Sequence, residues 1–252
     1  MPHDFLPQLI TRKAAGKKSL AILIDPDKAH PDAILDLLQQ ANQHGVDAFL
    51  VGGSLLKDDY IQQLVPLMKA NTDIPVILFP GGVQQIVPSA DGILFLSLIS
   101  GRNPDLLIGQ HVVAAPLLHQ TDLEIIPTGY MLIESGRLTT AHYMSNTLPI
   151  PRDKADIATS TALAGEMLGL QLIYLEAGSG AQEAVPEEMI RSVSDHLSIP
   201  LIVGGGIRSA EAARQCWQAG ADLLVIGSAI EKRPDLLPEL CQVRLEMGEG
   251  VR

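Results

Sequence analysis

The sequence has few cysteines, few aromatic residues and a deficit of positive charge. Its only cysteines are Cys216 and Cys241, so no disulfide framework is expected, and such sparse cysteine is typical of a reducing cytoplasm. The 18 Lys and Arg residues face 29 Asp and Glu residues, and the formal net charge of −11 argues against nucleic acid as a partner.

Long apolar runs are absent as well. No stretch approaches the roughly 18 consecutive apolar residues that a membrane-spanning helix needs. No basic segment followed by an apolar one indicates a signal peptide. We therefore expect a cytoplasmic protein with at most peripheral membrane contact.

What the sequence does contain is a regular alternation of strand and helix patterns. Of its 252 residues, 46% are hydrophobic but only 4% aromatic, a composition typical of buried parallel strands made of Val, Ile and Leu. Strands are predicted at residues 19–25, 48–53, 75–80, 92–99, 124–133, 172–177, 200–204 and 223–227. Eight strands in a chain of this length favour a single α/β domain over residues 1–252, a (β/α)8 or TIM barrel.

Helix patterns fill the segments between these strands, with one exception. Helices are predicted at residues 33–43, 58–69, 105–118, 154–168, 187–197, 210–219 and 236–247. Only residues 83–91 join the third strand to the fourth, and Pro88 interrupts them, so a full helix does not fit. We therefore predict a modified barrel whose third helix is missing or replaced by a short segment, with a gap where an apolar ligand tail can lie.

Two glycine-rich segments follow the last two predicted strands. Residues 201–206 read LIVGGG, and residues 223–228 read LLVIGS. In a TIM barrel the loops after strands 7 and 8 place backbone N–H groups around a phosphate, and only glycine lets the backbone come that close. The sequence therefore predicts a ligand that carries phosphate.

Two oxygen-bearing side chains end neighbouring predicted strands. Asp25 follows the first strand, and Ser54 follows the second. A carboxylate and a hydroxyl at adjacent strand ends can hold Mg²⁺, which takes its remaining ligands from water and substrate phosphates. The alternative is local, because Asp25 can also cap a turn and Ser54 the helix after it.

A carboxylate also lies within the sixth predicted strand. Tyr174 and Glu176 are two residues apart, so both side chains point into the barrel, while Leu175 points toward the helices. An inward carboxylate is costly unless it has a partner or a task. Glu176 is therefore predicted to act in catalysis or ligand binding, with an internal salt bridge as the alternative.

These segments, taken in order, resemble the signature segments of geranylgeranylglyceryl phosphate synthases. The resemblance runs from about residue 20 to residue 231. It rests on LIDPDK at 23–28, VGGS at 51–54, SNTLPIP at 145–151, YLEAGSG at 174–180, VGGGI at 203–207 and IGS at 226–228. One relative carries a lysine where this chain has Leu23, which disfavours the bacterial heptaprenyl branch and leaves the positive charge for the phosphate to come from elsewhere.

The resemblance implies a barrel without its third helix and a specific reaction. A prenyl group moves from a prenyl diphosphate to the primary hydroxyl of sn-glycerol 1-phosphate, giving an ether and diphosphate. Asp25 and Ser54 are implied to bind Mg²⁺. The residues implied to surround glycerol phosphate are Tyr174, Leu175, Glu176, Ala177, Gly178, Ser179, Gly180, Gly204, Gly205, Gly227 and Ser228.

A mechanism follows from the charges. Mg²⁺ and Lys28 neutralise the leaving diphosphate, Glu176 accepts the proton of the attacking hydroxyl, and Tyr174 orients it.

Two alternative functions remain: an isomerase or aldolase on the same fold, and a non-catalytic phosphometabolite-binding protein. A Schiff-base aldolase needs a lysine inside the barrel, and no predicted strand contains one.

A homo-oligomer is expected, with Tyr143, Trp217 and apolar helix faces as candidate contacts. Separately, residues 83–100 are predicted to close the far end of the prenyl groove.

Overall fold

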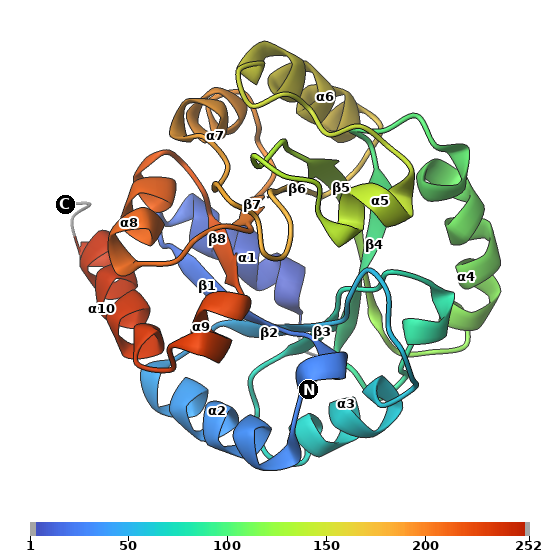
Figure 1. Cartoon of the computed structure of the whole chain (residues 1–252), viewed down its shortest axis with the longest axis vertical. Coiled ribbons are helices and arrows are strands. Elements are labelled where there is room, and N and C mark those ends of the chain that lie inside the picture. Colours follow the sequence, from blue (N-terminus) through green and yellow to red (C-terminus); the bar gives the residue numbers. More distant parts are fainter. Residues whose placement is uncertain (1–3, 250–252) are drawn as a thin grey trace.

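A computed structural model describes residues 4–249. Its eight parallel strands close into a barrel in the order β1 to β8, with helices around the outside (Figure 1). The strands are β1 Ser19–Ile24, β2 Ala48–Val51, β3 Val76–Leu78, β4 Gly92–Leu98, β5 Glu124–Leu132, β6 Leu172–Glu176, β7 Leu201–Gly204 and β8 Leu223–Ile226. Each overlaps its predicted range, so the predicted TIM barrel is confirmed.

The outer helices also follow the prediction, including the absence of a helix between β3 and β4. They are α2 Pro31–His44, α3 Ile61–Lys69, α4 Gln110–Leu118 with a preceding π turn η3 Asp105–Gly109, α6 Ala155–Met167, α7 Glu187–Ser194, α8 Ala210–Gln218 and α10 Leu236–Glu249. Between β3 and β4 the chain forms only a 3-10 turn, η2 Val83–Gln85. The third crossover therefore lacks a helix, as predicted. No helix within residues 4–249 is long and apolar enough to cross a membrane.

The structure adds an N-terminal helix that the sequence patterns did not reveal. Helix α1, Phe5–Ala14, packs Phe5, Leu6 and Leu9 against the residues inside the barrel. The Glu124 carboxylate, at the start of β5, accepts the backbone N–H groups of Phe5 at 2.7 Å and Leu6 at 2.9 Å. These two bonds satisfy N–H groups that have no partner within the helix. Helix α1 thus closes the amino-terminal end of the barrel and leaves the opposite end open.

Alternation along each strand divides the apolar residues into two layers. On β1, Ala21 and Leu23 belong to the cluster inside the barrel, whereas Ile22 and Ile24 pack against the outer helices. Asp25 continues the inward series of Ala21 and Leu23, so the strand period directs it to the carboxyl-terminal mouth. The same alternation of side chains along a strand directs Tyr174 and Glu176 of β6 into the barrel.

One predicted interface residue is excluded by the core. Trp217 is only 1% exposed, and its indole Nε1 donates to the carbonyl oxygen of Ser19 at 3.3 Å. The prediction that Trp217 contributes to an interface is therefore wrong, because α8 turns this side chain toward the barrel. Tyr143, on the short helix α5 Thr140–Ser145, is 81% exposed and remains available for contact.

Candidate active site

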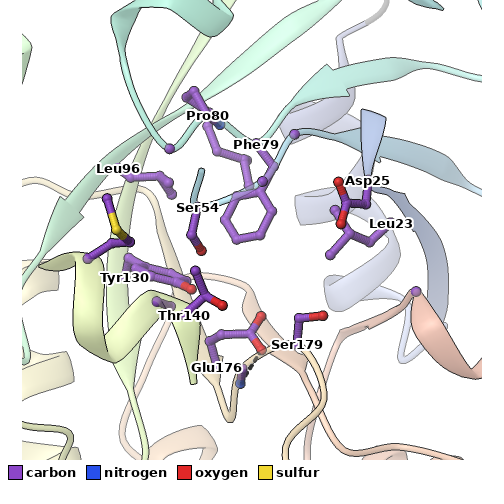
Figure 2. Close-up of a pocket in the computed structure, with 18 of the residues that line it drawn as sticks. Leu23, Asp25, Ser54, Phe79, Pro80, Leu96, Tyr130, Thr140, Glu176 and Ser179 are labelled. Atoms are coloured by element: carbon purple, nitrogen blue, oxygen red, sulfur yellow. Dashed lines mark hydrogen bonds between the residues drawn. The ribbon is translucent and has the colours of Figure 1, made fainter. Parts of the chain in front are cut away.

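A cavity of about 540 Å³ opens at the carboxyl-terminal ends of the strands (Figure 2). Most of the predicted site residues line it: Asp25, Ser54, Tyr174, Glu176, Gly178, Ser179, Gly180, Gly205, Gly227 and Ser228. Leu175, Ala177 and Gly204 do not line it. Leu175 and Ala177 are buried against the outer helices, and Gly204 ends β7 beside Glu176 in the sheet. The barrel thus brings together ten predicted residues from the ends of five strands, β1, β2, β6, β7 and β8.

Glu176 projects into this cavity with no cation beside it. The side chain is 5% exposed, and its Oε1 accepts the Gly178 N–H at 2.5 Å. Burial raises the pKa of Glu176, while the neighbouring Tyr174 hydroxyl and the Gly178 N–H act in the opposite direction. No Lys, Arg or His within residues 4–249 forms an ion pair with it. The salt-bridge alternative is therefore wrong, and Glu176 is a buried carboxylate without a counter-charge.

Three aromatic rings pack together in the cavity that holds the carboxylate, and only one of them was predicted. Tyr174 stacks on Phe79 with 5.3 Å between ring centroids, and Tyr130 meets both rings edge-on at 5.5 and 5.7 Å. Burial and the charge of Glu176 raise the pKa values of Tyr130 and Tyr174 well above the usual tyrosine range. Both phenols therefore stay neutral. Period-two alternation along β5 indicates that Tyr130 points inward, but only barrel closure brings the three rings together.

The glycine loops after β7 and β8 leave a row of unused backbone donors. Gly205 has φ +81°, and a Cβ there would lie 2.5 Å from Glu176 Oε1 and 2.6 Å from the Gly178 nitrogen. Gly205, Gly206, Gly227 and Ser228 line the cavity, and within residues 4–249 their backbone N–H groups have no protein acceptor. The geometry leaves these groups free for an anion. Gly178 also lines the cavity, but its N–H is donated to Glu176 and is not one of these free groups.

Asp25 lies at the mouth between a turn and a lysine. Its Oδ1 accepts the Asp27 N–H at 3.2 Å, so it does cap the 3-10 turn η1 Pro26–Lys28, and its Oδ2 lies 2.6 Å from the Lys28 ammonium. Ser54 does not cap a helix, since α3 begins after Tyr60. Figure 2 shows the Asp25, Ser54 and Glu176 side chains projecting toward one space. Among residues 4–249 no group of three or more His, Cys, Asp or Glu forms a possible metal centre.

The cavity continues from this polar mouth into the gap left by the missing third helix. Its walls there come from η2, β4, η3 and α4, and they carry Val83, Ile86, Ile93, Phe95, Leu106 and Ala114. Gln110 and His111, both on α4, are polar residues on these walls, and His111 is buried. The His111 ring meets Phe95 edge-on at 4.4 Å between centroids, and its Nε2 lies 3.1 Å from the Ser97 hydroxyl. The predicted groove for an apolar tail therefore exists as a continuation of the site.

A closed barrel, an unpaired inward carboxylate and free loop N–H groups at one mouth define a (β/α)8-barrel enzyme with its site at the strand carboxyl ends. The PcrB family model matches residues 13–243, and the chain belongs to that family.

Named relatives with high sequence identity or a closely similar structure support the family assignment. The chain is 53% identical over 239 residues to the geranylgeranylglyceryl phosphate synthase of Spirosoma linguale, covering 95% of this chain and 96% of that one. It is 52% identical over 240 residues to the synthase of Chitinophaga pinensis, covering 95% of each. The (S)-3-O-geranylgeranylglyceryl phosphate synthase of Thermoplasma acidophilum, solved with sn-glycerol-1-phosphate, has a TM-score of 0.90 at 35% identity, covering 96% and 98%. The resemblance in the sequence is confirmed, and the protein is an enzyme of this family.

Proposed function

We propose that this enzyme transfers the prenyl group of geranylgeranyl diphosphate to the free primary hydroxyl of sn-glycerol 1-phosphate and releases diphosphate. The resulting ether is a precursor of ether phospholipids. The observation that carries this proposal is the position of Glu176, an unpaired buried carboxylate between the free loop N–H groups and the apolar groove. The names of the relatives and the glycerol phosphate complex of the Thermoplasma protein support it.

The two substrates fit opposite parts of the cavity. The phosphate of glycerol phosphate would accept the N–H groups of Gly205, Gly206, Gly227 and Ser228. Its hydroxyl would then lie near Glu176, because Gly205 directly adjoins that carboxylate. The prenyl tail would occupy the groove beside η2 and α4, with its diphosphate toward Asp25 and Lys28.

The residues at the mouth fit a magnesium ion. Asp25 offers a carboxylate that already attracts a cation, the Lys28 ammonium, and Ser54 offers a hydroxyl in the same cavity. With no carboxylate cluster among residues 4–249, the metal would take its other ligands from water and diphosphate oxygens. Mg²⁺ bound there would offset the negative charge of the leaving diphosphate.

The chain's own residues account for the remaining steps. As the bond between C1 and the diphosphate oxygen breaks, C1 gains positive charge, and the partly exposed rings of Phe79 and Tyr130 would stabilise it. The glycerol oxygen forms the new bond to C1, and its proton passes to Glu176. The apolar walls of the groove would limit the access of water to C1.

The alternative reactions have less support. A Schiff-base aldolase would need a lysine inside the barrel, and the eight strands carry none. Burying an unpaired carboxylate costs free energy, and a protein that only binds its ligand would not need one.

We also expect a cytoplasmic homo-oligomer, with exposed Tyr143 and Leu148 as candidate contacts.

The direct test is turnover with a mixed pool of prenyl diphosphates. With sn-glycerol 1-phosphate and Mg²⁺, mass spectrometry should detect a prenylglyceryl phosphate, with the geranylgeranyl product dominant. No product with any prenyl donor would reject the reaction, and a dominant product of another length would correct the donor.

Gly205→Val should weaken glycerol phosphate binding far more than prenyl diphosphate binding. The branched side chain would collide with Glu176 and Gly178, and φ +81° is strained for valine. Calorimetry with each ligand separately measures both affinities. Equal losses for the two ligands would indicate general misfolding and would contradict a local phosphate site.

The pH dependence should show the ionisation of Glu176. Because burial raises the pKa of Glu176, kcat/KM should fall as the pH drops through a value above the usual glutamate range, where the base becomes protonated. This acidic limb should be missing from the residual activity of a Glu176→Gln variant. If the limb persists in that variant, another group is the base.

A further inference from the structure

The ammonium group of Lys28 forms an ion pair with Asp25, the carboxylate that is proposed to bind a metal. Its Nζ lies 2.6 Å from Asp25 Oδ2, a contact between side chains that are 52% and 27% exposed. The other acidic groups acting on Lys28 are Asp27 on the same turn and Glu231 on helix α9 Ser228–Lys232. The Asp27 carboxylate already accepts the Lys57 backbone N–H at 3.1 and 3.2 Å. Asp25 is therefore the carboxylate that Lys28 contacts directly.

A metal ion on Asp25 and the Lys28 ammonium compete for the same carboxylate. Mg²⁺ binds oxygen at about 2.0–2.1 Å, and two positive charges held by one carboxylate repel each other, so metal binding weakens the contact between Asp25 and Lys28. The backbone of Lys28 is held by its N–H bond to the Asp25 carbonyl at 3.0 Å, but its half-exposed side chain can rotate. Lys28 lines the same cavity, so a rotated ammonium stays at the mouth.

We propose that Lys28 is a built-in counter-cation that exchanges between two partners. Without metal it neutralises Asp25, and when the metal binds Asp25 it is displaced to the diphosphate of the prenyl substrate. The inference rests on the proposed function in that it takes Asp25 as a metal ligand. No covalent bond changes; only ion pairs exchange.

This exchange makes metal and diphosphate binding reinforce each other. Diphosphate arriving alone would draw Lys28 away and leave the Asp25 carboxylate uncompensated next to another anion, which is unfavourable. Metal arriving first displaces Lys28, and the released ammonium then favours diphosphate. In a protein of net charge −11 such a stored positive charge at the mouth is useful, since most of the surroundings repel anionic substrates.

The test measures metal binding by the full-length protein without substrate. Mn²⁺ is the probe, and electron paramagnetic resonance counts the free ion. Lys28→Met should tighten Mn²⁺ binding about two- to fivefold, the size expected for loss of one competing exposed ion pair. In the same variant at saturating metal, inorganic diphosphate should bind about tenfold more weakly, because a charged hydrogen-bond donor is gone.

Lys57→Met is the matched control. Lys57 also lines the cavity, and its side chain makes no ion pair within residues 4–249. Its removal changes the net charge equally but frees no carboxylate, so the gain in Mn²⁺ affinity should be clearly smaller. Asp25→Asn should abolish the binding in either background.

The Mn²⁺ affinities of these variants distinguish a failure of the exchange from a failure of the metal site. Equal Mn²⁺ affinity in the wild type and Lys28→Met, or equal gains in both lysine variants, overturns the exchange while leaving the metal site in place. Tight Mn²⁺ binding that survives Asp25→Asn overturns both the exchange and the assigned ligand. If no variant binds Mn²⁺ at millimolar concentration, the metal part of the proposed function fails with it, whereas product formation in the turnover assay would still stand.

Discussion

Glu176→Gln should reduce turnover roughly 10²- to 10⁴-fold while glycerol phosphate still binds. Glutamine keeps the length of the side chain and can still accept the Gly178 N–H, but it cannot take a proton. The aromatic rings and the free loop N–H groups remain in place. Single-turnover kinetics measures the chemical step, and calorimetry with glycerol phosphate measures binding.

The same substitution should not destabilise the protein. Burial raises the pKa of Glu176, so this group stabilises the fold most when protonated, below its unfolded-state pKa, and that contribution is lost as the pH rises through the folded-state pKa. At neutral pH the wild type therefore holds an unfavourable buried charge with no ion-pair partner among residues 4–249. The melting temperature of Glu176→Gln should equal or exceed that of the wild type.

Glu124→Gln provides the matched control. Glu124 sits at the closed end of the same barrel, where it accepts N–H groups of α1. This variant should change the melting temperature with little change in turnover per folded molecule. A near-wild-type rate for Glu176→Gln would end its assignment as the base, and a large loss of stability would return it to a structural role.

Asp25→Asn should remove the Mg²⁺ dependence of turnover and lower the rate about 10²- to 10³-fold, as losses of one contact to a developing charge do. Asparagine can still accept the Asp27 N–H, so the turn after β1 should persist. Folding should be intact, because the side chain lies at the rim of the mouth rather than in the core. A Mg²⁺ titration of the initial rate is the measurement.

The neighbouring carboxylate is the control for this variant. Asp27→Asn also removes one negative charge from the cavity lining, but Asp27 holds the Lys57 backbone rather than an ion. It should retain Mg²⁺ dependence. An unchanged titration curve for Asp25→Asn would discard the metal assignment, as would an equal loss in both variants.

Much of the site could be predicted from local patterns. The strands follow from short runs of Val, Ile and Leu, and the period of two directs Asp25 and Glu176 inward. The missing third helix follows from chain length, since residues 83–91 are too few and contain Pro88. These features depend on neighbouring residues alone.

Other features depend on barrel closure. The sequence did not reveal that α1 closes one end, because Phe5, Leu6 and Leu9 form a meaningful face only against the barrel interior. Nor did it predict the Phe79–Tyr130–Tyr174 cluster, the use of the Gly178 N–H by Glu176, or the burial of Trp217. The sequence alone determined which residues form strands and which side each faces. Only the tertiary structure decided which side chains meet, because the closed sheet sets the stagger between strands distant in the chain.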